Sequence, residues 1–599
     1  MRCCRLSMSN ALLRWRRRFL LYLSQQPQYS ETALTLFFAL FIGIVVGATA
    51  VGYHNLISTL YNFFFHFLPA RLSLSPHWFW LLVPLLGGGI QALLIALWPD
   101  IAAEKGIVEV MKVLKLKGGV TRLRTVVFQF VGSSLNMGTG GPVGPEGPAA
   151  QIGAGVGSLL GQFFHLSEER LRVLVAAGAG AAIAAVFNAP LAGVFFAMEV
   201  ILLNELRDIT FGILVLSSVT GAIITRIYLT AAPVFVIPDY AKPLIRDFPW
   251  FLILGVVCGI LSVFWMQVSS FYARLIWQRW RNVPRWVFPL FAGLAAGVVA
   301  LWFPRVLGIG YEAVGELFTG SVLLRSALLL VVFKLLLTPL NIESGGMGGT
   351  FAPSLFLGAM LGFGFGVLLS MVLHQEVNLV LFTLVGMGST LASLNGIPIT
   401  AIIMLFELTR DYDQILPVMV GVVGAVVTFQ LATGERSIYL MKLHKAGLME
   451  EDRLGVPVLA TVKLSELLRT DLPVVKPETT FREILNLIQD LPYNDLVVKY
   501  DDGTLAMITL SDMRSVLFQT QINELIVAAD MAIPITPIRI TDQADEILDR
   551  IEKQNVEYLP VVDGAGNISG LLTRHDLLHA MNQNVAAWQL RRRRGASFK

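Results

Sequence analysis

The chain has 599 residues, of which 55% are hydrophobic and 15% charged, and its mean hydropathy is +0.66. Soluble domains carry about a quarter charged residues, so this composition excludes an ordinary soluble protein and predicts an integral membrane protein. The net charge of +4 is too small to indicate nucleic-acid binding. Apolar runs stop near residue 430. We therefore expect a membrane domain followed by a soluble tail domain.

Basic clusters flank the apolar runs, at residues 14–18, 112–124, 274–285 and 591–594. By the positive-inside rule they predict cytoplasmic segments, with both termini inside. For the last cluster, a solvated tail explains the charges as well as contact with membrane lipid does. The N-terminus does not resemble a cleaved signal peptide, because its first apolar run is short and a long one follows. We expect a multi-pass protein of a bacterial inner membrane.

A helix needs about 20 apolar residues to span a bilayer. Runs of this kind lie at residues 33–51, 79–98, 250–268, 286–302, 323–340 and 416–431. Other apolar runs are interrupted by Gly and Pro. Irregular backbone persists inside a membrane only where it lines a cavity or is buried in protein, so the interrupted runs predict the functional site.

The interrupted runs occur twice, about 205 residues apart. GPEGPAAQIGAGVG at 144–157 aligns with GTFAPSLFLGAMLG at 349–362, which matches Pro148 with Pro353. FNAPLAGVFFAME at 187–199 aligns with LNGIPITAIIMLFE at 394–407, and both contain an Asn, a Pro and a later Glu. Two matching blocks in the same order predict a duplicated domain. Corresponding Gly/Pro interruptions in two halves favour an inverted repeat with a binding site at mid-membrane.

Each Gly/Pro segment comes just before a helix-forming run, so each predicts a helix N-terminus that directs main-chain amides, including those of Gly144 and Gly147, at one point. Such ends attract anions without a full positive charge, and weak binding allows release. Glu146 lies at one of these ends. Its carboxylate would occupy the position of the anion until it is protonated or swings away. A helix-capping or loop Glu is the structural alternative.

Two glycine patterns carry a weaker signal. GAGVGS at 153–158 and AAGAGAA at 176–182 resemble dinucleotide-binding glycines, but no strand, turn and acidic residue accompany them at the required distance. Small residues of this kind are more typical of close helix packing. Cys3, Cys4 and Cys258 show no metal-ligand spacing, so we expect no metal site.

The tail contains two similar units. Residues 471–517 predict the order strand, helix, strand, Asp-Gly turn, strand, helix, and residues 532–581 repeat it, which predicts a paired α/β module. We divide the chain into an N-terminal segment (1–32), a transmembrane domain (33–445), a linker (446–455), two tail units (456–520 and 521–583) and a basic tail (584–599).

From Ala33 to about Lys445 the chain resembles the CLC family of chloride channels and proton/chloride antiporters. GPEGP resembles the family's G(K/R)EGP filter motif, GGTFAP resembles GGxFAP, and FNAPLAGVFFAMEV resembles the helix after the filter. The motif ERSIYLMK has Tyr439 at the position of the pore tyrosine. The resemblance implies an all-α polytopic membrane domain with an inverted repeat and broken helices. It also implies a homodimer with one pore in each subunit.

The same resemblance implies transport of chloride or a similar small anion, with Glu146 as the gating glutamate. Carried over by position, Thr350 and Phe351 give backbone amides to the anion, and Tyr439 offers its hydroxyl. Where the family has GSGIP, this chain has EKGIV, so Lys105 replaces the serine. Lys105 either strengthens anion binding or points away while Gly106 and Ile107 supply amides.

A second departure concerns protons. Family antiporters commonly carry an internal proton-transfer glutamate where this chain has Val200. Because valine cannot relay protons, this position favours a passive channel. A proton-coupled antiporter remains the alternative, with water or Glu199 as the carrier. A cation transporter is more distant, since it would need acidic residues clustered within several spans. No nucleophile and base constellation indicates an enzyme.

The tail resembles a pair of CBS domains, in which a hydroxyl residue and an Asp three positions later often hold an adenine nucleotide. Thr509 with Asp512, and Thr573 with Asp576, fit that spacing. The resemblance therefore implies binding of ATP, ADP or AMP, and we expect no other cofactor. The alternative is a structural module in which these residues cap helices.

Overall fold

The computed structural model divides the chain into two units, Met1–Met449 and Glu450–Lys599, and each is described by itself. The structure describes residues 30–72, 76–164, 166, 168–203, 208–229, 235, 237–238, 240–319, 322–445, 467–469, 474–490, 495–509, 512–513, 526–539, 542, 547, 550–551, 556, 558–563, 568–573 and 577.

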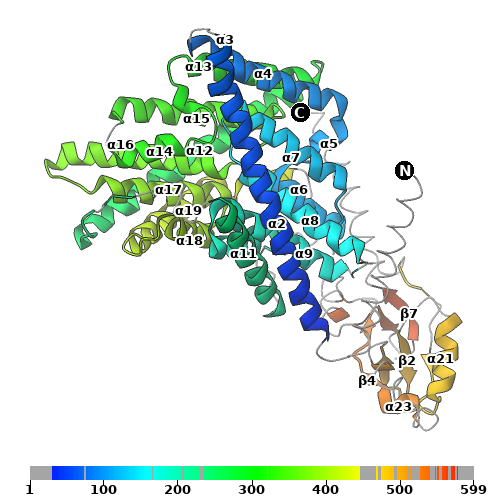
Figure 1. The fold of residues 1–599 in the computed structure, drawn as a ribbon. Helices are drawn as coiled ribbons and strands as arrows, with labels where there is room; N and C mark the ends of the chain where they lie inside the picture. Colours follow the sequence, from blue (N-terminus) through cyan, green and yellow to red (C-terminus); the bar gives the residue numbers. More distant parts are fainter. Residues whose placement is uncertain are drawn as a thin grey trace, which may run out of the picture. The chain divides into compact units, whose positions relative to one another are not determined.

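The described part of the first unit is built from helices (Figure 1). In chain order they are α2 (Ser30–Asn62), η1 (Phe63–Phe67), α3 (Leu68–Leu72), α4 (Pro76–Leu97), α5 (Pro99–Ala103), α6 (Gly106–Leu116), α7 (Leu123–Gly138), α8 (Glu146–Phe163), α9 (Glu168–Phe187), α10 (Pro190–Phe196), η2 (Ala197–Ile201), α11 (Asp208–Tyr228), η3 (Ile245–Asp247), α12 (Phe248–Arg274), η4 (Leu275–Arg279), η5 (Arg285–Val287), α13 (Phe288–Ala300), η6 (Pro304–Val306), α14 (Tyr311–Phe318), α15 (Leu324–Glu343), α16 (Phe351–Leu373), α17 (Leu379–Asn395), α18 (Pro398–Thr409), α19 (Ile415–Thr433) and α20 (Ile438–Lys445).

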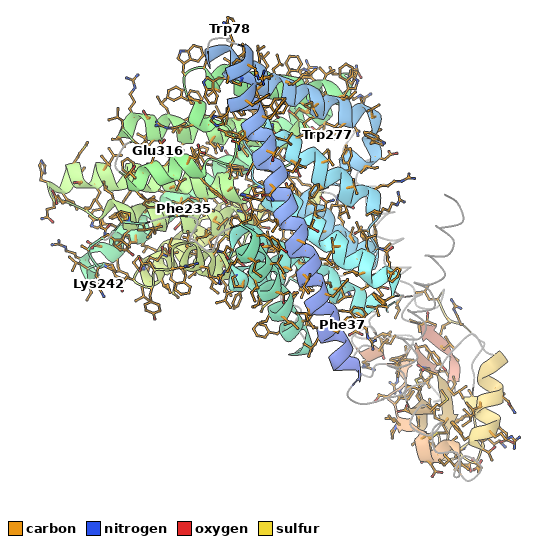
Figure 2. All side chains as sticks on the ribbon, in the orientation of Figure 1. Phe37, Trp78, Phe235, Lys242, Trp277 and Glu316 are labelled. Atoms are coloured by element: carbon orange, nitrogen blue, oxygen red, sulfur yellow. The ribbon has the colours of Figure 1, made fainter. Side chains whose placement is uncertain are left out.

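Among the described residues, eight helical stretches are long and apolar enough to cross a membrane. They include Glu168–Phe187 and Phe351–Leu373, which lie outside the uninterrupted apolar runs expected from the sequence. Conversely, the run at 286–302 does not form a full span: α13 has 13 residues, fewer than the roughly 20 required. Large apolar side chains such as Phe37, Trp78 and Trp277 project outward from the helices, as expected of a lipid-facing surface (Figure 2).

The membrane unit contains the same helix arrangement twice. Helix α8 packs on α9, α9 on α11 and α11 on α2; in the second half α16 packs on α17, α17 on α19 and α19 on α12. In Figure 1 the cyan helices α7 and α8 lie on one side of the long helix α2, and the green helices α15 and α16 lie on the other. The duplication predicted from two short blocks therefore extends over four packed helices in each half.

Glycines allow the α8–α9 and α16–α17 pairs to approach closely. A Cβ atom on Gly153 would lie 2.2 Å from the carbonyl oxygen of Gly178, and one on Gly358 would lie 2.1 Å from that of Gly386. Both distances are too short for any side chain, so the glycine stripes serve helix packing in each half.

The second unit contains two small sheets with the same pairing pattern. Its elements are β1 (Val474–Val475), α21 (Phe481–Asp490), β2 (Leu496–Lys499), β3 (Leu505–Ile508), α23 (Ala528–Met531), β4 (Ile533–Pro534), β5 (Ile538–Arg539), β6 (Tyr558–Val562) and β7 (Ile568–Thr573). The sheet orders are β1-β2-β3-β4 and β5-β6-β7. In each sheet the first pair is parallel and the next antiparallel, for example Val497 opposite Met507. Gly503 turns between β2 and β3 with φ +85°, as the Asp-Gly sequence predicts.

Candidate anion-binding site

Helices α8 and α16 begin where the two halves of the membrane unit cross. The segments before them form an antiparallel bridge, in which Gly144 and Gly349 exchange N–H···O bonds of 3.0 and 2.6 Å. Asn136 and Asn341, at the same separation in sequence, join their side chains at 3.0 Å. Antiparallel contact between equivalent residues places a local two-fold axis between the halves. The repeat is therefore inverted.

Each helix presents its first-turn amides toward this crossing. The third residue of α8 is Pro148 and that of α16 is Pro353, and proline has no N–H. The available donors of each first turn are therefore the two residues before the proline, which include Gly147 in α8 and Phe351 in α16. With the N-terminal partial charges of two helices, these groups form a site suited to an anion.

The Glu146 carboxylate lies in this crossing. Its side chain is fully buried, and its Oε1 accepts a 2.9 Å hydrogen bond from the Ala352 N–H, the second amide of α16. Its Oε2 has no partner among the residues that the structure describes. A Cβ atom on Gly144 would lie 2.1 Å from Oε2, and one on Gly349 2.8 Å from it, so both glycines make room for the carboxylate. Glu146 thus occupies the position in which an anion would meet the α16 amides.

Ala352 was not among the residues singled out from the sequence. A signal for it was present, however, because Ala352 is the counterpart of Gly147 when the two halves are aligned through Pro148 and Pro353. The Glu146 carboxylate of the first half therefore binds the Ala352 amide of the second half, and Ala352 is the counterpart of Gly147, the residue next to Glu146.

Tyr439 and Thr350 lie in a buried polar cluster beside this crossing. Their hydroxyl oxygens are 2.8 Å apart, and each lies within hydrogen-bond distance of Asn395 Oδ1, at 2.8 Å from Tyr439 and 2.6 Å from Thr350. Thr350 is the residue before α16, and Asn395 is the last residue of α17. The sequence showed that an Asn recurs in both halves but gave Asn395 no role.

Lys105 points toward carbonyl groups. Its ammonium donates to the carbonyl oxygens of Ile342 and Gly346, at 2.8 and 3.2 Å, near the C-terminal end of α15. Cations stabilise that end of a helix because its carbonyls carry partial negative charge. The Lys105 side chain therefore points away from the anion position and bonds main-chain carbonyls of the protein instead.

The neighbouring amide of Gly106 is also occupied. It donates to Gln151 Oε1 at 2.6 Å, while Gln151 Nε2 donates to the Glu104 carbonyl at 2.8 Å. Gln151 belongs to α8, so the helix that begins at Glu146 also holds the segment Glu104–Gly106 in place through two hydrogen bonds. Ile107 is buried in the first turn of α6. In this arrangement the Gly106 amide does not serve as an anion donor.

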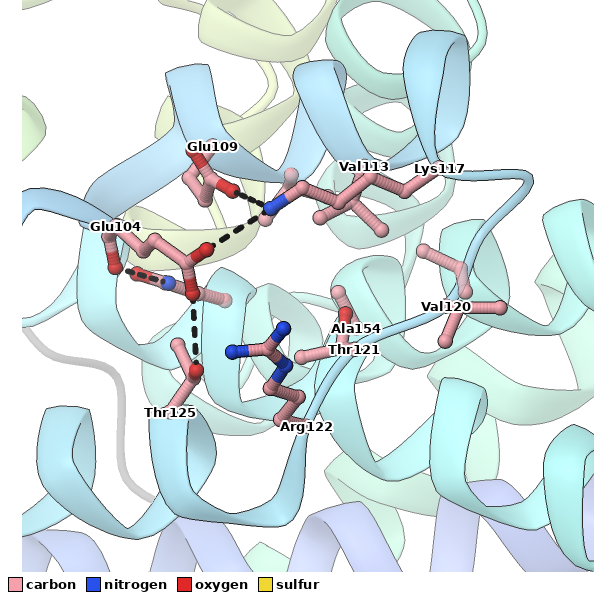
Figure 3. Close-up of a pocket in the computed structure, with 12 residues that line it drawn as sticks. Glu104, Glu109, Val113, Lys117, Val120, Thr121, Arg122, Thr125 and Ala154 are labelled. Carbon is pink, nitrogen blue, oxygen red and sulfur yellow. Dashed lines mark hydrogen bonds and ion pairs between the residues drawn. The ribbon is translucent and has the colours of Figure 1, made fainter. Parts of the chain in front are cut away.

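A cavity of about 240 Å³ lies behind this loop (Figure 3). Lys117 bonds both Glu104 and Glu109 there, each at 2.9 Å, and Thr125 donates to Glu104 at 3.1 Å. Burial alone would lower the pKa of Lys117, but its hydrogen bonds to Glu109 and Glu104 raise it above the ordinary value. Lys117 therefore stays charged at neutral pH, and its charge is balanced by the carboxylates.

Glu199 and Glu407 each cap a helix of the opposite half. Glu199 accepts from the Ile399 and Thr400 amides at 3.0 and 2.8 Å, and also from the Thr400 hydroxyl. Glu407 accepts from the amides of residues 191 and 192 at the start of α10. Val200, beside Glu199, is buried. The glutamate of each duplicated block thus caps the N-terminus of the short helix in the other half.

A larger cavity, of about 530 Å³, reaches the chain neighbours of the polar cluster. Its lining includes Gly396 and Leu440, which follow Asn395 and Tyr439 in sequence, together with Lys112, Lys115, Arg436 and Glu199. The lysines belong to a basic cluster that the positive-inside rule assigns to the cytoplasm. Positive side chains around such an opening raise the local concentration of anions.

In the second unit, Asp512 is engaged locally. Its Oδ2 accepts from the Thr509 N–H at 2.9 Å and from the Thr509 hydroxyl at 2.7 Å, which is a capping arrangement. Thr573 ends β7 and is buried. Asp576 lies outside the described residues. The geometry of Thr509 and Asp512 therefore matches the helix-capping alternative considered for this motif.

Comparison with known proteins agrees with this architecture. Residues 87–430 match the family described as "Voltage gated chloride channel", and residues 464–519 and 526–583 match the CBS domain. The chain is 28% identical to chloride channel protein CLC-e of Arabidopsis thaliana over 82% of this chain and 77% of that protein. It is 29% identical to the H(+)/Cl(-) exchange transporter ClcA of Vibrio cholerae over 74% of this chain and 93% of that protein.

Solved structures show the same fold. A slow cyanobacterial Cl−/H+ antiporter superposes with a TM-score of 0.63 and 25% identity, over 70% of this chain and 99% of its own. A eukaryotic CLC transporter superposes with a TM-score of 0.65 and 19% identity, over 90% and 97%. The family match covers more than half of the chain and includes both filter segments. The protein is therefore a multi-pass membrane member of the voltage-gated chloride channel (CLC) family, with a CBS-domain pair after its membrane unit.

Proposed function

We propose that the protein moves chloride or a similar small anion across the membrane in exchange for protons, with Glu146 as the gate. The observation that carries this proposal is the hydrogen bond from the Ala352 amide to the buried Glu146 carboxylate. A carboxylate and a small anion compete for the same donor. Transport therefore requires the carboxylate to leave, and protonation makes leaving easier because it removes the charge that the helix ends hold.

The two inverted helix ends supply the binding energy. Main-chain amides and partial charges attract an anion but hold it weakly enough for release. The Gly144–Gly349 bridge fixes the two segments against each other, so the amides keep their direction when the carboxylate moves. The same rigid donors serve the gate and the transported ion in turn.

Exchange replaces the passive channel that Val200 favoured at first, because the comparisons do not support a preference for a channel. ClcA of Vibrio cholerae is named an exchange transporter, and a CLC-type fluoride/proton antiporter shares the fold with a TM-score of 0.59. Val200 supplies no acid, so protons must reach Glu146 through water or through Glu199. Glu199 lines the larger cavity, which gives it access to water.

Reconstitution into liposomes with a chloride gradient tests this function. The wild-type protein should drive proton uptake against the proton gradient. Glu146→Ala should abolish proton coupling and the pH dependence of flux while anion flux continues, because the competing carboxylate is gone. Glu312→Ala, which changes an exposed glutamate of α14, is the matched control and should behave as wild type. Unaltered pH dependence in Glu146→Ala would defeat the gating role.

The proposal extends to assembly and regulation. We propose a homodimer in a bacterial inner membrane, with both termini and the CBS pair on the cytoplasmic side. An adenine nucleotide bound to the CBS pair would act as regulator. Binding of ATP to the full-length protein, measured by calorimetry, tests the nucleotide; its absence would leave Thr509 and Asp512 with the capping role alone.

A further inference from the structure

The buried cluster of Thr350, Asn395 and Tyr439 joins three separate parts of the second half. Thr350 precedes α16, Asn395 ends α17 and Tyr439 lies in α20. All three residues are at least nine-tenths buried, and their polar atoms meet within 2.6–2.8 Å. Buried hydroxyls need partners, so this convergence determines where their protons point.

The orientation of the Asn395 amide is fixed by the protein. Its Nδ2 donates to the Leu391 carbonyl at 3.0 Å and to Ser354 Oγ at 3.2 Å. A carbonyl only accepts hydrogen bonds, and the Ser354 hydroxyl already donates to the Phe351 carbonyl. Flipping the amide would place Oδ1 against acceptors. Asn395 must therefore present Oδ1 to the two hydroxyls.

The cluster has more contacts than protons. Thr350 and Tyr439 each have one hydroxyl proton, but the three oxygens make three close contacts. Two protons satisfy only two of these contacts at a time. One hydroxyl can therefore turn toward an incoming anion while the other keeps its bond within the cluster. No buried polar group then loses all its partners, which would otherwise be costly.

The cluster adjoins, along the chain, both the lining of the larger cavity and the start of α16. Gly396 and Leu440, which follow Asn395 and Tyr439, line that cavity. On the other side, Thr350 directly precedes α16, whose Ala352 amide holds the Glu146 carboxylate. The hydroxyl pair therefore lies beside the start of α16, where the Glu146 carboxylate is bound.

We infer that the Thr350 hydroxyl is a second side-chain donor to the transported anion, acting in alternation with Tyr439, and that Asn395 positions both hydroxyls. This inference rests on the proposed anion transport and specifies how the anion is selected. A small, strongly hydrated anion loses more water on entry and needs more replacement donors than a large, weakly hydrated one. A hydroxyl donor supplied by either Thr350 or Tyr439 therefore favours chloride over thiocyanate.

Calorimetric titration of the purified full-length protein with chloride and with thiocyanate tests the donor. Thr350→Val removes the hydroxyl at nearly constant volume and should weaken chloride binding about tenfold, with a smaller effect on thiocyanate. Thr350→Ser keeps the hydroxyl and should restore the wild-type ratio. Thr383→Val is the matched control, because the Thr383 hydroxyl donates to the Leu379 carbonyl within its own helix, α17. If Thr350→Val misfolds, Thr350→Ala replaces it.

The role of Asn395 as a positioning residue needs a coupling measurement. Asn395→Leu and Tyr439→Phe should each lower the chloride-to-thiocyanate ratio, and the double variant should lose no more than the larger single loss, because the hydroxyl that Tyr439→Phe removes is one of the two that Asn395 orients. Additive losses would overturn the positioning role. A merely structural Asn would lower stability without moving the ratio.

The outcomes separate this inference from the proposed function. A wild-type protein that neither binds nor transports chloride would contradict the proposed function before any variant is compared. Chloride transport by the wild type together with an unchanged ratio in Thr350→Val and Thr350→Ala would overturn the hydroxyl donor and leave the function intact.

Discussion

The two halves of the membrane unit share a scaffold but differ in the side chains at its centre. Both have a Gly/Pro segment before a helix, a glycine-lined helix pair and a short helical segment that carries a capping glutamate near its C-terminal end. The first half contributes Glu146 to the crossing, whereas the second has Phe351 at the equivalent position. The duplication supplies converging amides, and the departure from symmetry supplies the gate.

The recurring asparagines show the same division. Asn188 of the first half accepts from Arg226 in a partly exposed position, while Asn395 of the second half holds Tyr439 and Thr350 in the interior. Scaffold positions should therefore respond equally to substitution in both halves, and central positions should not. Three comparisons test that rule.

The bridging glycines should show the largest and most unequal effects. A Cβ atom on Gly349 would lie 2.6 Å from the Gly147 amide nitrogen, so Gly349→Ala meets backbone and should cost about 3 kcal/mol of stability. A Cβ atom on Gly144 instead meets the Glu146 side chain, which can move. Gly144→Ala should therefore fold and conduct anions with reduced pH dependence. Thermal unfolding and liposome flux measure the two effects.

Gly315→Ala is the control for these variants, because a Cβ atom there would meet nothing within 4 Å. It should match wild type in both assays. Equal behaviour of Gly144→Ala and Gly349→Ala would break the proposed difference between gate and backbone.

The packing glycines should respond equally. Gly153→Ala and Gly358→Ala each push a methyl group against a carbonyl of the partner helix, at 2.2 and 2.1 Å. Overpacking of this kind costs about 2 kcal/mol. We expect similar losses of unfolding temperature in detergent, with unchanged anion selectivity in the protein that remains folded. A lower unfolding temperature in only one of the two variants would show that the glycine-lined helix pairs do not contribute equally to stability.

The capping glutamates should show the smallest effects. Glu199→Ala and Glu407→Ala each remove the acceptor for two first-turn amides, at about 1 kcal/mol each. Thermal unfolding should register both losses, the first slightly larger because Glu199 also accepts from the Thr400 hydroxyl. Proton uptake by liposomes separates the two roles of Glu199: loss of coupling in Glu199→Ala alone would assign it to proton transfer as well as capping.

Part of the fold could be predicted because it depends on local rules. Apolar length indicated most membrane spans, and matched prolines indicated the duplication. Those rules missed Glu168–Phe187, 78% of whose span window is buried in protein instead of facing lipid. Such a helix needs small residues for packing more than it needs hydropathy. The opposite error occurred at 286–302, where the apolar run predicted a membrane span but the helix α13 has only 13 residues.

The sequence by itself determined the membrane class, the repeat and the presence of an acid at a helix N-terminus, because composition, spacing and proline positions act within a few residues. Only the tertiary structure decided which atoms meet. Glu146 reaches the amide of Ala352, Asn395 meets Tyr439, and Lys105 turns to carbonyls near the end of α15. These partners lie far apart in sequence, and a side chain finds them only once the helices are packed and its remaining hydrogen-bond choices are fixed.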